Sequence, residues 1–166
     1  TAISKAKRVL EIGSFTSYAS LAMAEALPND GKLIACEFDP FTANFARKQL
    51  SDSKHSDKIE IRVGDAIQTL EDLSIEKQQF DLVFIDADKQ NYQAYYDIVL
   101  DADLLKLGGI ICVDNTLYQG QAYQDGETSA NGEAIKAFNT AVTNDSRVQQ
   151  VLLPLRDGLT VIRRLH

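Results

Sequence analysis

The sequence has few of the residues that build disulfide frameworks or zinc centres. Its 166 residues include two cysteines, two histidines and no tryptophan. Cys36 and Cys112 each lie inside an apolar run, where we expect a small buried side chain rather than a paired thiol. No cluster of Cys and His offers the ligands that zinc sites usually use. The chain must therefore fold on a hydrophobic core, and its length is enough for one domain to do so.

Basic clusters and long apolar runs are missing as well. No stretch approaches the roughly 20 apolar residues of a membrane-spanning helix, and no signal-peptide pattern is present. Asp and Glu number 24 against 17 Lys and Arg, which gives a net charge of -7 at pH 7. Such a charge repels nucleic-acid backbones unless a local basic patch overrides it. We therefore expect a cytoplasmic protein with no membrane partner, and a nucleic-acid partner is disfavoured.

The apolar residues that are present alternate between strand-like and helix-like spacing. Short apolar runs separated by amphipathic stretches are typical of a parallel sheet covered by helices. The runs predicted to form parallel strands are 8–13, 32–38, 59–63, 80–86 and 108–115. Apolar residues at helical spacing predict helices that include 43–50, 92–99 and 135–142.

The C-terminal end departs from this alternation. The runs at 148–155 and 158–165 are separated by only Arg156 and Asp157. Parallel neighbours need a long crossover, so these two runs must form an antiparallel hairpin that turns at Asp157-Gly158. The predicted fold is α/β: a mostly parallel, seven-stranded, Rossmann-like sheet with a C-terminal antiparallel hairpin and helices on both faces. This arrangement resembles a class I methyltransferase more than a dehydrogenase.

The carboxyl end of the first strand has a single glycine where dinucleotide-binding proteins have three. In open α/β sheets, ligands bind beyond the carboxyl ends of the strands. Here that end reads Glu11-Ile12-Gly13, without the G-x-G-x-x-G spacing that brings a pyrophosphate close to the backbone. Gly13 still permits a sharp turn and a close approach to a ligand. Glu11 suits a cationic ammonium group, such as that of S-adenosylmethionine (SAM), and a nicotinamide cofactor is disfavoured.

Acidic residues also follow the second and third strands. An acid at the tip of the second strand commonly accepts the hydroxyls of a ribose. Asp39 stands before Pro40 and suits the N-cap of the next helix, which leaves Glu37 as the expected ribose ligand. Asp65, after the third strand, has two equally good explanations. It accepts an adenine amino hydrogen, or it caps the helix that starts at Ala66.

The ends of the fourth and fifth strands carry oxygen-bearing side chains and a lysine. Adjacent parallel strands lie about 5 Å apart, so Asp86 should lie close to Asp114 and Asn115. Two carboxylates and an amide are hard oxygen ligands that suit Mg²⁺, with Mn²⁺ or Ca²⁺ as substitutes. Lys89 is near enough to act as a base or to hold a phenolate. The alternative is that these are ordinary polar residues where strands leave the core, with Lys89 in solvent.

Together these segments resemble a known family, the cation-dependent O-methyltransferases typified by caffeoyl-CoA and catechol O-methyltransferases. The similarity is carried by LEIGSFTSYASLAMAEALP, ACEFDP, VGDA, FIDADKQNY, VDNTL and LPLRDGLTVIRR, and it runs from about Arg8 to Arg164. The resemblance implies that SAM is held by Glu11, Gly13, Ser14, Glu37, Ala66 and Asp88, to which we add Asp65 and Asp86. It also implies that the metal ligands are Asp86, Asp114 and Asn115 and that the catalytic base is Lys89.

Two departures from the family pattern concern the cofactor loop and the start of the chain. Ser17 stands where the family usually has glycine, and Ala19 stands where it has a serine that contacts the methionine carboxylate. Ser17, Ser20 or backbone amides would have to compensate. The family also has helices ahead of the first strand, which have no counterpart here. We therefore expect residues 1–166 to be a single methyltransferase domain that lacks the family's N-terminal helices.

The expected reaction is a methyl transfer from SAM to one hydroxyl of a catechol-like small molecule. The metal would chelate both oxygens of the vicinal diol, and Lys89 would remove a proton. The loop from Tyr118 to Ala130 is expected to select the acceptor. Two alternatives remain open: a tRNA hydroxyuridine O-methyltransferase of the same family, which the acidic charge disfavours, and a catalytically impaired SAM-binding module. For the full-length protein we expect a homodimer.

Overall fold

The computed structural model describes every residue from Thr1 to His166. It contains seven strands, five α-helices and three short 3₁₀ helices. The strands are β1 (Arg8–Ile12), β2 (Lys32–Glu37), β3 (Ile59–Val63), β4 (Phe80–Ile85), β5 (Leu105–Asp114), β6 (Val148–Leu153) and β7 (Leu159–Arg164). The α-helices are α1 (Tyr18–Glu25), α2 (Pro40–Leu50), α3 (Ala66–Ile75), α4 (Tyr92–Asp101) and α5 (Ala130–Asn144). The 3₁₀ helices are η1 (Ser56–Lys58), η2 (Lys89–Asn91) and η3 (Tyr118–Gly120).

All seven strands form one sheet in the order β3-β2-β1-β4-β5-β7-β6. Strands β1 to β5 pair in parallel, whereas β7 lies antiparallel between β5 and β6. The turn of the β6–β7 hairpin is closed by the Gly158 amide, which donates to the Leu155 carbonyl at 2.9 Å. The predicted class I methyltransferase sheet and its C-terminal hairpin are therefore confirmed.

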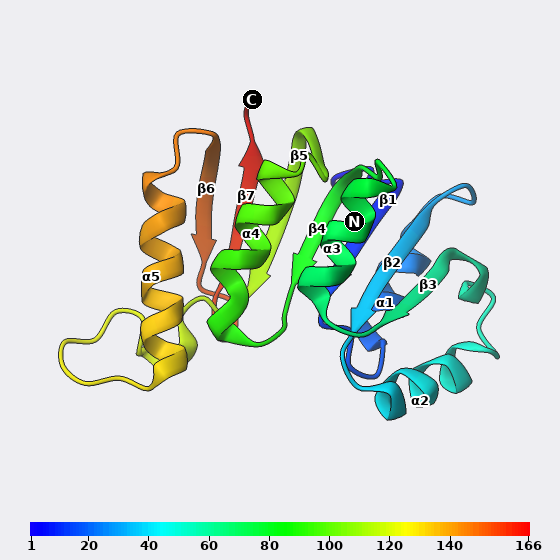
Figure 1. The fold of residues 1–166 in the computed structure, drawn as a ribbon, viewed down its shortest axis with the longest axis horizontal. Helices are drawn as coiled ribbons and strands as arrows, with labels where there is room; N and C mark the ends of the chain where they lie inside the picture. Colours follow the sequence, from blue (N-terminus) through cyan, green and yellow to red (C-terminus); the bar gives the residue numbers. More distant parts are fainter.

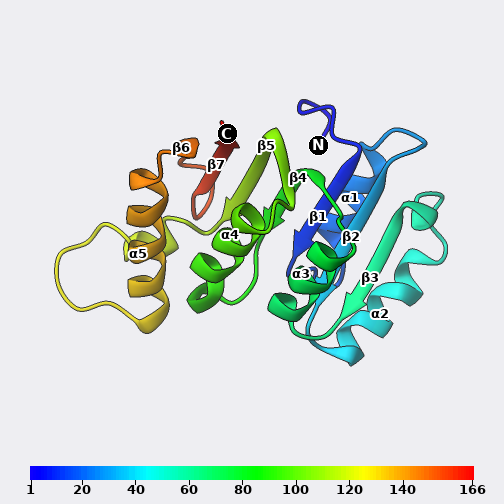
Figure 2. The ribbon, with the colours of Figure 1, turned by 45° about the horizontal axis from the view of Figure 1, so that its top comes forward.

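Helices lie on both faces of this sheet. Figures 1 and 2 show α3, α4 and α5 on one face and α1 behind the other. Because side chains alternate along a strand, Leu10 and Ile12 of β1 point into a core of 24 buried residues that includes side chains of α3, α4 and α5. Val9 points the other way, into a smaller core of six buried residues against which Met23 of α1 packs. The carboxyl ends of the central strands emerge between these two layers.

The two cysteines differ in burial. Cys36 on β2 is buried as expected, but Cys112 on β5 is only partly buried. Cys112 pairs in register with Phe84, which pairs with Glu11, so its side chain faces the side of the sheet that carries α1. Helix α1 packs against β2 and β3 rather than against β5. The expectation that Cys112 is buried was wrong because an apolar run does not reveal how far the covering helix reaches.

Local sequence explains where α2 and α3 begin. Asp39 caps α2 as expected: its carboxylate accepts from the Thr42 amide at 2.9 Å, and Pro40 occupies the first turn. Asp65 caps α3 by accepting from the Ile67 amide at 2.7 Å. Of the two explanations left open for Asp65, the capping role is therefore fulfilled in the structure.

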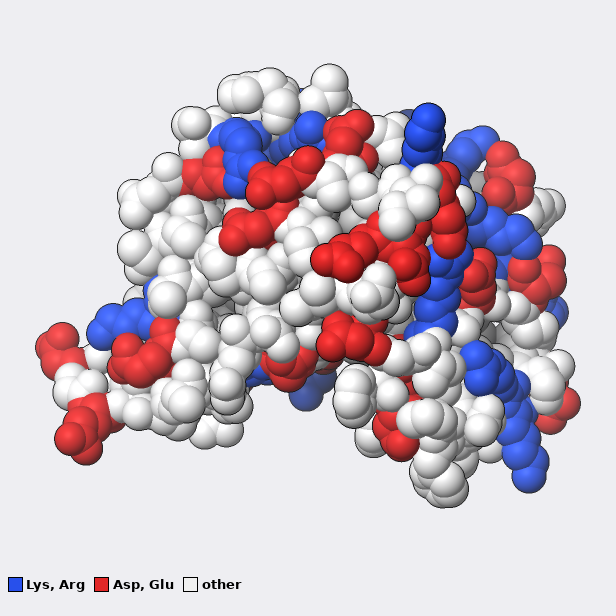
Figure 3. Space-filling model, viewed as in Figure 1, with Lys and Arg blue, Asp and Glu red and all other residues white.

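The surface carries charges of both signs. Figure 3 shows acidic and basic side chains interleaved over the face that carries α3, α4 and α5, without a broad basic area. An extended polyanion on this face would meet carboxylates wherever it met lysine or arginine. No helix in the molecule is both long enough and apolar enough to cross a membrane.

Candidate functional site

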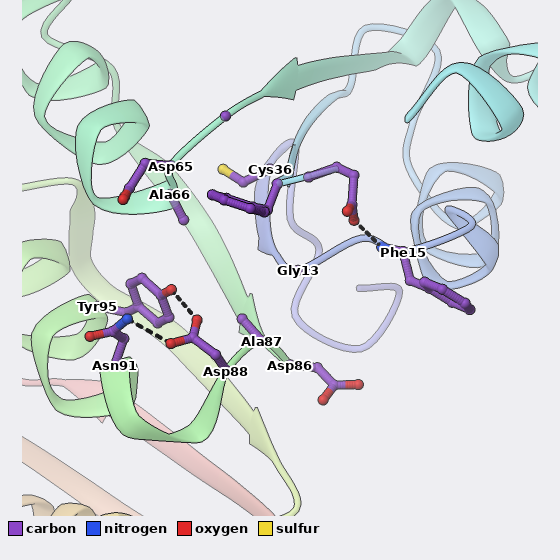
Figure 4. A pocket seen from close by; sticks show the side chains of 13 residues that line it. Gly13, Phe15, Cys36, Asp65, Ala66, Asp86, Ala87, Asp88, Asn91 and Tyr95 are labelled. Carbon is purple, nitrogen blue, oxygen red and sulfur yellow. Dashed lines mark hydrogen bonds between the residues drawn. The ribbon is translucent and has the colours of Figure 1, made fainter. Parts of the chain in front are cut away.

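A cavity of about 500 Å³ opens at the carboxyl ends of β1, β2, β3 and β4. The residues predicted to hold a cofactor that line it are Gly13, Glu37, Asp65, Ala66, Asp86 and Asp88, most of which are labelled in Figure 4. The sequence did not identify seven further lining residues, which are Phe15, Cys36, Phe38, Gly64, Ala87, Asn91 and Tyr95. The predicted residues Glu11 and Ser14 are buried and do not line the cavity. A cavity of this volume is in the range of small-molecule and cofactor sites.

Gly13 is required by the close approach of two backbone segments. It has a φ of +90°, and a Cβ at this position would overlap the carbonyl oxygen of Asp86 and press on the Cα of Ala87. The amides of Gly13 and Ser14 both donate to the Cys36 carbonyl, at 3.1 and 3.0 Å. The loop after β1 is therefore held against the ends of β2 and β4. Gly13 thus allows a close approach to the segment that follows β4, and because it also lines the cavity, the expected approach of a ligand stays a prediction.

The same loop explains the departure at residue 17. Ser17 precedes α1 with a φ of +60° and makes no side-chain capping bond. Glycine adopts this left-handed conformation without strain, which accounts for glycine as the usual residue. The Ser14 and Ser17 hydroxyls are buried without hydrogen-bond partners. Ser20 instead donates to Glu11, so Ser17 has the uncommitted hydroxyl that could compensate for Ala19.

Glu11 is a buried carboxyl group beneath α1. It is 1% exposed, its Oε2 accepts from the Ser20 hydroxyl, and its Oε1 has no hydrogen-bond partner. Burial raises the pKa of Glu11 to about 7; the negative charges of Asp86 and Glu37 add to the shift, and the hydrogen bond from Ser20 opposes it. Glu11, Ser14 and Ser17, all close in sequence to Gly13, therefore each have a buried polar atom whose hydrogen-bonding capacity is not filled.

Glu11 makes the stability of the apo chain depend on pH. Between pH 4.5 and about 7 the unfolded state has released this proton and the folded state retains it, so stability falls as the pH rises through this window. Glu11→Gln keeps the shape of the side chain and removes the titration. We therefore compare the unfolding free energies of the parent chain and Glu11→Gln. From about pH 5 to about pH 8, the variant should gain roughly 2–3 kcal/mol of stability relative to the parent chain. Denaturant titrations followed by circular dichroism measure it.

Glu25→Gln, on the exposed side of α1, is the matched control for that measurement. It removes a carboxylate from the helix that covers Glu11 without altering a buried group, so its difference from the parent chain should stay nearly constant with pH. Parallel stability curves for the parent chain and Glu11→Gln would contradict the assignment of a raised pKa to Glu11.

Glu37 joins the loops that follow β1 and β2. Its Oε2 accepts from the Phe15 amide at 2.7 Å, drawn in Figure 4, and its Oε1 accepts from the Asp39 amide at 3.0 Å. The side chain is buried in the cavity wall. Each carboxylate oxygen has a further lone pair that these amides leave free, so Glu37 can still accept hydrogen bonds from a ligand.

Asp88 is fixed by side chains at the start of α4. Its carboxylate accepts from Asn91 Nδ2 at 2.6 Å and from the Tyr95 hydroxyl, and Figure 4 shows both bonds at the cavity wall. Burial and the bond to Asp88 raise the pKa of the Tyr95 phenol, which keeps it a hydrogen-bond donor. In the sequence, Tyr95 is only one residue of a helical stripe, and its spacing does not indicate that its hydroxyl reaches the cavity.

Asp86 and Asp114 lie at neighbouring strand ends. Ile85 pairs with Val113 in the parallel register, so the residues that follow them leave the sheet side by side. One oxygen of Asp114 accepts from the Asn115 amide at 2.9 Å, while the Asn115 side chain makes no hydrogen bond. No group of three or more His, Cys, Asp or Glu side chains could hold a metal ion. A cation site here would need the amide of Asn115, and this donor set of hard oxygens fits Mg²⁺.

Lys89 links these two strand ends. Its Nζ donates to Asp86 Oδ1 at 2.9 Å and to the Tyr92 hydroxyl at 2.6 Å, and the side chain is only 13% exposed. The Tyr92 hydroxyl in turn donates to the Asp114 carbonyl at 3.1 Å. A continuous chain of hydrogen bonds therefore connects Asp86, Lys89, Tyr92 and Asp114, and the alternative of a solvated Lys89 was wrong.

The segment after Asn115 is braced by the C-terminal hairpin and α5. The Thr116 amide donates to the Gly158 carbonyl at 3.2 Å, and the Thr160 hydroxyl donates to the Thr116 hydroxyl at 2.9 Å in a buried pair. Asn139 Nδ2 donates to the Thr116 carbonyl at 2.8 Å. In the sequence, Gly158 indicates only a turn, whereas the structure places that turn against the segment that carries Asn115.

The predicted acceptor loop closes on itself. Gln121 Oε1 accepts from both the amide and the hydroxyl of Ser129, at 3.0 and 2.7 Å, and Figure 1 shows the segment between them projecting beside α5. At its start, the Tyr118 hydroxyl accepts from Asn131, which also accepts from Gln90 beside Lys89. Selection of the acceptor by this loop stays a prediction, and the contacts favour its first residues for that role.

Comparison with known sequences connects this site to methyl transfer. The chain matches the family model described as O-methyltransferase over residues 1–165. It is 38% identical to tapetum-specific methyltransferase 1 of Arabidopsis thaliana, over 98% of this chain and 72% of that protein. It is 34% identical to caffeoyl-CoA O-methyltransferase of Eucalyptus gunnii, over 97% of this chain and 67% of that protein. It is 37% identical to catechol O-methyltransferase domain-containing protein 1 of Mus musculus, over 95% of this chain and 60% of that protein. The chain thus spans between 60% and 72% of the length of these relatives.

Solved structures agree with this grouping. The O-methyltransferase TomG from Streptomyces achromogenes, in complex with SAM, superposes with a TM-score of 0.92 at 28% identity, over 99% of this chain and 76% of that one. A methyltransferase from Podospora anserina, bound to S-adenosylhomocysteine (SAH), has a TM-score of 0.87 at 29% identity, over 99% and 74%. Both similarities cover the strands, the cavity and the Lys89 segment described above.

Proposed function

This chain belongs to the O-methyltransferase family, and on that premise we propose that it moves the methyl group of SAM to one hydroxyl of a catechol-like small molecule, with a divalent cation, Mg²⁺, at the strand ends. One observation carries the proposal: Asp86, Lys89 and Asp114 are joined by hydrogen bonds through Tyr92, beside a cavity of about 500 Å³. This geometry supports the assignment of Lys89 as the base and of Asp86 and Asp114 as cation ligands, next to a volume suited to a nucleoside cofactor.

The charge of the cavity suits SAM. The cofactor carries a sulfonium and an ammonium group, and the cavity wall carries the carboxylates of Glu37, Asp65, Asp86 and Asp88. We assign the ribose hydroxyls to Glu37, because Asp39 has the capping role and leaves Glu37 free for another. Asp65 and Ala66 then border the adenine.

The methionine end of SAM is assigned to buried polar atoms of residues close in sequence to Gly13. Glu11 Oε1 and the hydroxyls of Ser14 and Ser17 have no partners in the protein, and such groups are costly unless a ligand or water satisfies them. We assign to Ser17 the contact with the methionine carboxylate that Ala19 cannot make. These unfilled groups are the feature that supports binding of a polar ligand here.

The residues at the strand ends would have two roles: some would bind the cation that holds the acceptor, and one would remove the acceptor's proton. Asp86, Asp114 and Asn115 would hold the cation, which supplies Lewis-acid stabilisation of the ionised hydroxyl. Lys89 lies beside these ligands and would take the proton of the attacking hydroxyl. The acceptor oxygen and the sulfonium methyl group would be aligned at the carboxyl ends of the strands, so positioning would account for a large part of the rate enhancement.

The assignment of Glu37 predicts a loss of cofactor affinity. Glu37→Ala removes charge-assisted hydrogen bonds to the ribose and the contacts that hold the Phe15 and Asp39 amides. We expect the affinity for SAH, measured by calorimetry, to weaken by roughly 2–4 kcal/mol. Asp39→Ala, the matched control two residues away, should cost about 1 kcal/mol of stability and leave SAH affinity nearly unchanged. Equal affinities for the parent chain and Glu37→Ala would remove Glu37 from the ribose site.

A small acceptor is favoured over tRNA by the charge of the protein. The net charge is -7, and Figure 3 displays interleaved charges rather than a basic groove. A purely binding module is disfavoured because Lys89 is held at the strand ends by the Asp86 carboxylate and the Tyr92 hydroxyl. The homodimer expected for the full-length protein and its cytoplasmic location stay predictions.

An acceptor panel tests this proposal. The chain is incubated with SAM labelled in its methyl group, Mg²⁺, and catechols, monohydroxy phenols or bulk tRNA. We expect label in the catechols alone. Label in tRNA would select the nucleic-acid alternative, and tight SAH binding without transfer to any acceptor would select the binding module.

A further inference from the structure

Tyr92 places a phenolic hydroxyl at the centre of the candidate site. It is the first residue of α4, and its side chain is fully buried. The hydroxyl accepts from Lys89 Nζ at 2.6 Å and donates to the Asp114 carbonyl at 3.1 Å. Lys89 Nζ also lies 4.7 Å from the centre of the Tyr92 ring. Tyr92 therefore contacts the proposed base through both its ring and its hydroxyl.

Tyr96, one turn later on α4, shows what packing alone requires. Tyr92 and Tyr96 are both fully or almost fully buried, and both pack edge-on against Phe138, at ring-centre distances of 5.8 and 5.9 Å. The Tyr96 hydroxyl donates to Asp145, away from the strand ends. A phenylalanine would satisfy the aromatic packing at either position. The two tyrosines thus differ in what their hydroxyls hold.

We propose that Tyr92 is a positioning residue that fixes the amine of Lys89 between the ends of β4 and β5. A lysine side chain has four rotatable bonds and is costly to order. Asp86 holds Nζ from β4, and the Tyr92 hydroxyl holds it from the β5 side because that hydroxyl is itself bound to the Asp114 carbonyl. Tyr92 thereby sets the position of Lys89 relative to the Asp86 carboxylate and to the backbone at the end of β5. This role rests on the proposed function of Lys89 as the base.

Tyr92→Phe and Tyr96→Phe form a matched pair of variants. Each removes one buried hydroxyl from the same helix and keeps the ring against Phe138. With a catechol, saturating SAM and Mg²⁺, Tyr92→Phe should lower kcat by about 10- to 100-fold, the scale of a misplaced catalytic group, and change the KM for the catechol by less than about threefold. Tyr96→Phe should stay within about twofold of the parent chain. Equal kcat values for the parent chain and both variants would overturn the proposal.

A second measurement does not depend on turnover. Trace acylation of lysines, read out by peptide mass spectrometry, should modify Lys89 several-fold faster in Tyr92→Phe than in the parent chain or Tyr96→Phe, because its amine is no longer held. If no catechol is methylated by the parent chain but this contrast is seen, the proposed function fails and the positioning by Tyr92 stands. Equal acylation of Lys89 in all three proteins would overturn the positioning, whatever the activity.

Discussion

Replacement of Lys89 by methionine is expected to lower kcat by roughly 10²-fold or more, the usual scale for loss of a general base. Lys89→Met keeps most of the aliphatic stem and removes the amine that donates to Asp86 and Tyr92. Because Lys89 does not line the cofactor cavity, SAH affinity should change by less than about threefold. Steady-state kinetics with a catechol and calorimetry with SAH measure the two effects.

The matched control is Lys106→Met. Lys106 also pairs with an aspartate, Asp81 at 2.7 Å. This pair lies near the amino ends of β4 and β5, at the opposite end of these strands from Lys89. Its removal should leave kcat nearly unchanged. The defect of Lys89→Met should also shrink with nitrocatechols, whose hydroxyl ionises without help. Normal turnover of an ordinary catechol by Lys89→Met at neutral pH would remove Lys89 from the chemistry.

Replacement of Asp114 by alanine is expected to reduce methyl transfer by about 10³-fold or more, because a lost ligand removes the several kcal/mol of stabilisation that a cation supplies. The Asp114 side chain lies outside the cavity, so SAH should bind almost as before. Addition of EDTA to the parent chain should have the same effect, and it should have no further effect on Asp114→Ala. Asp101→Ala, which removes an exposed carboxylate paired with Arg147, is the control for charge. A variant Asp114→Ala with full activity would exclude the proposed cation site.

Most of the sheet could be predicted because buried parallel strands are apolar on both faces. The runs around Val83 and Ile111 have nothing polar to place on either side for several residues, which is typical of such strands. The two-residue link at Arg156 and Asp157 excludes a crossover and so identifies the hairpin. The incomplete burial of Cys112 could not be predicted, because it depends on which strands α1 covers.

The candidate site was predictable where strand ends define it. Parallel register alone brings Asp86 beside Asp114, so these residues could be grouped from the sequence. The role of the Tyr92 hydroxyl could not be found in this way. Helical spacing indicates the face on which a residue lies and not the groups that its hydroxyl reaches across the sheet edge. The contact of Thr116 with Thr160 could not be predicted either, because these residues are 44 positions apart and no local pattern links them.

On the proposed mechanism, a cation at Asp86, Asp114 and Asn115 activates a vicinal diol for methyl transfer. The most direct test is the rate of transfer from labelled SAM to a simple catechol, measured on the chain after treatment with EDTA while Mg²⁺ is added back. We expect no transfer above background in EDTA, a saturable return of activity with Mg²⁺, and no comparable transfer to a phenol with one hydroxyl. Transfer to the catechol at full rate in EDTA would contradict the account.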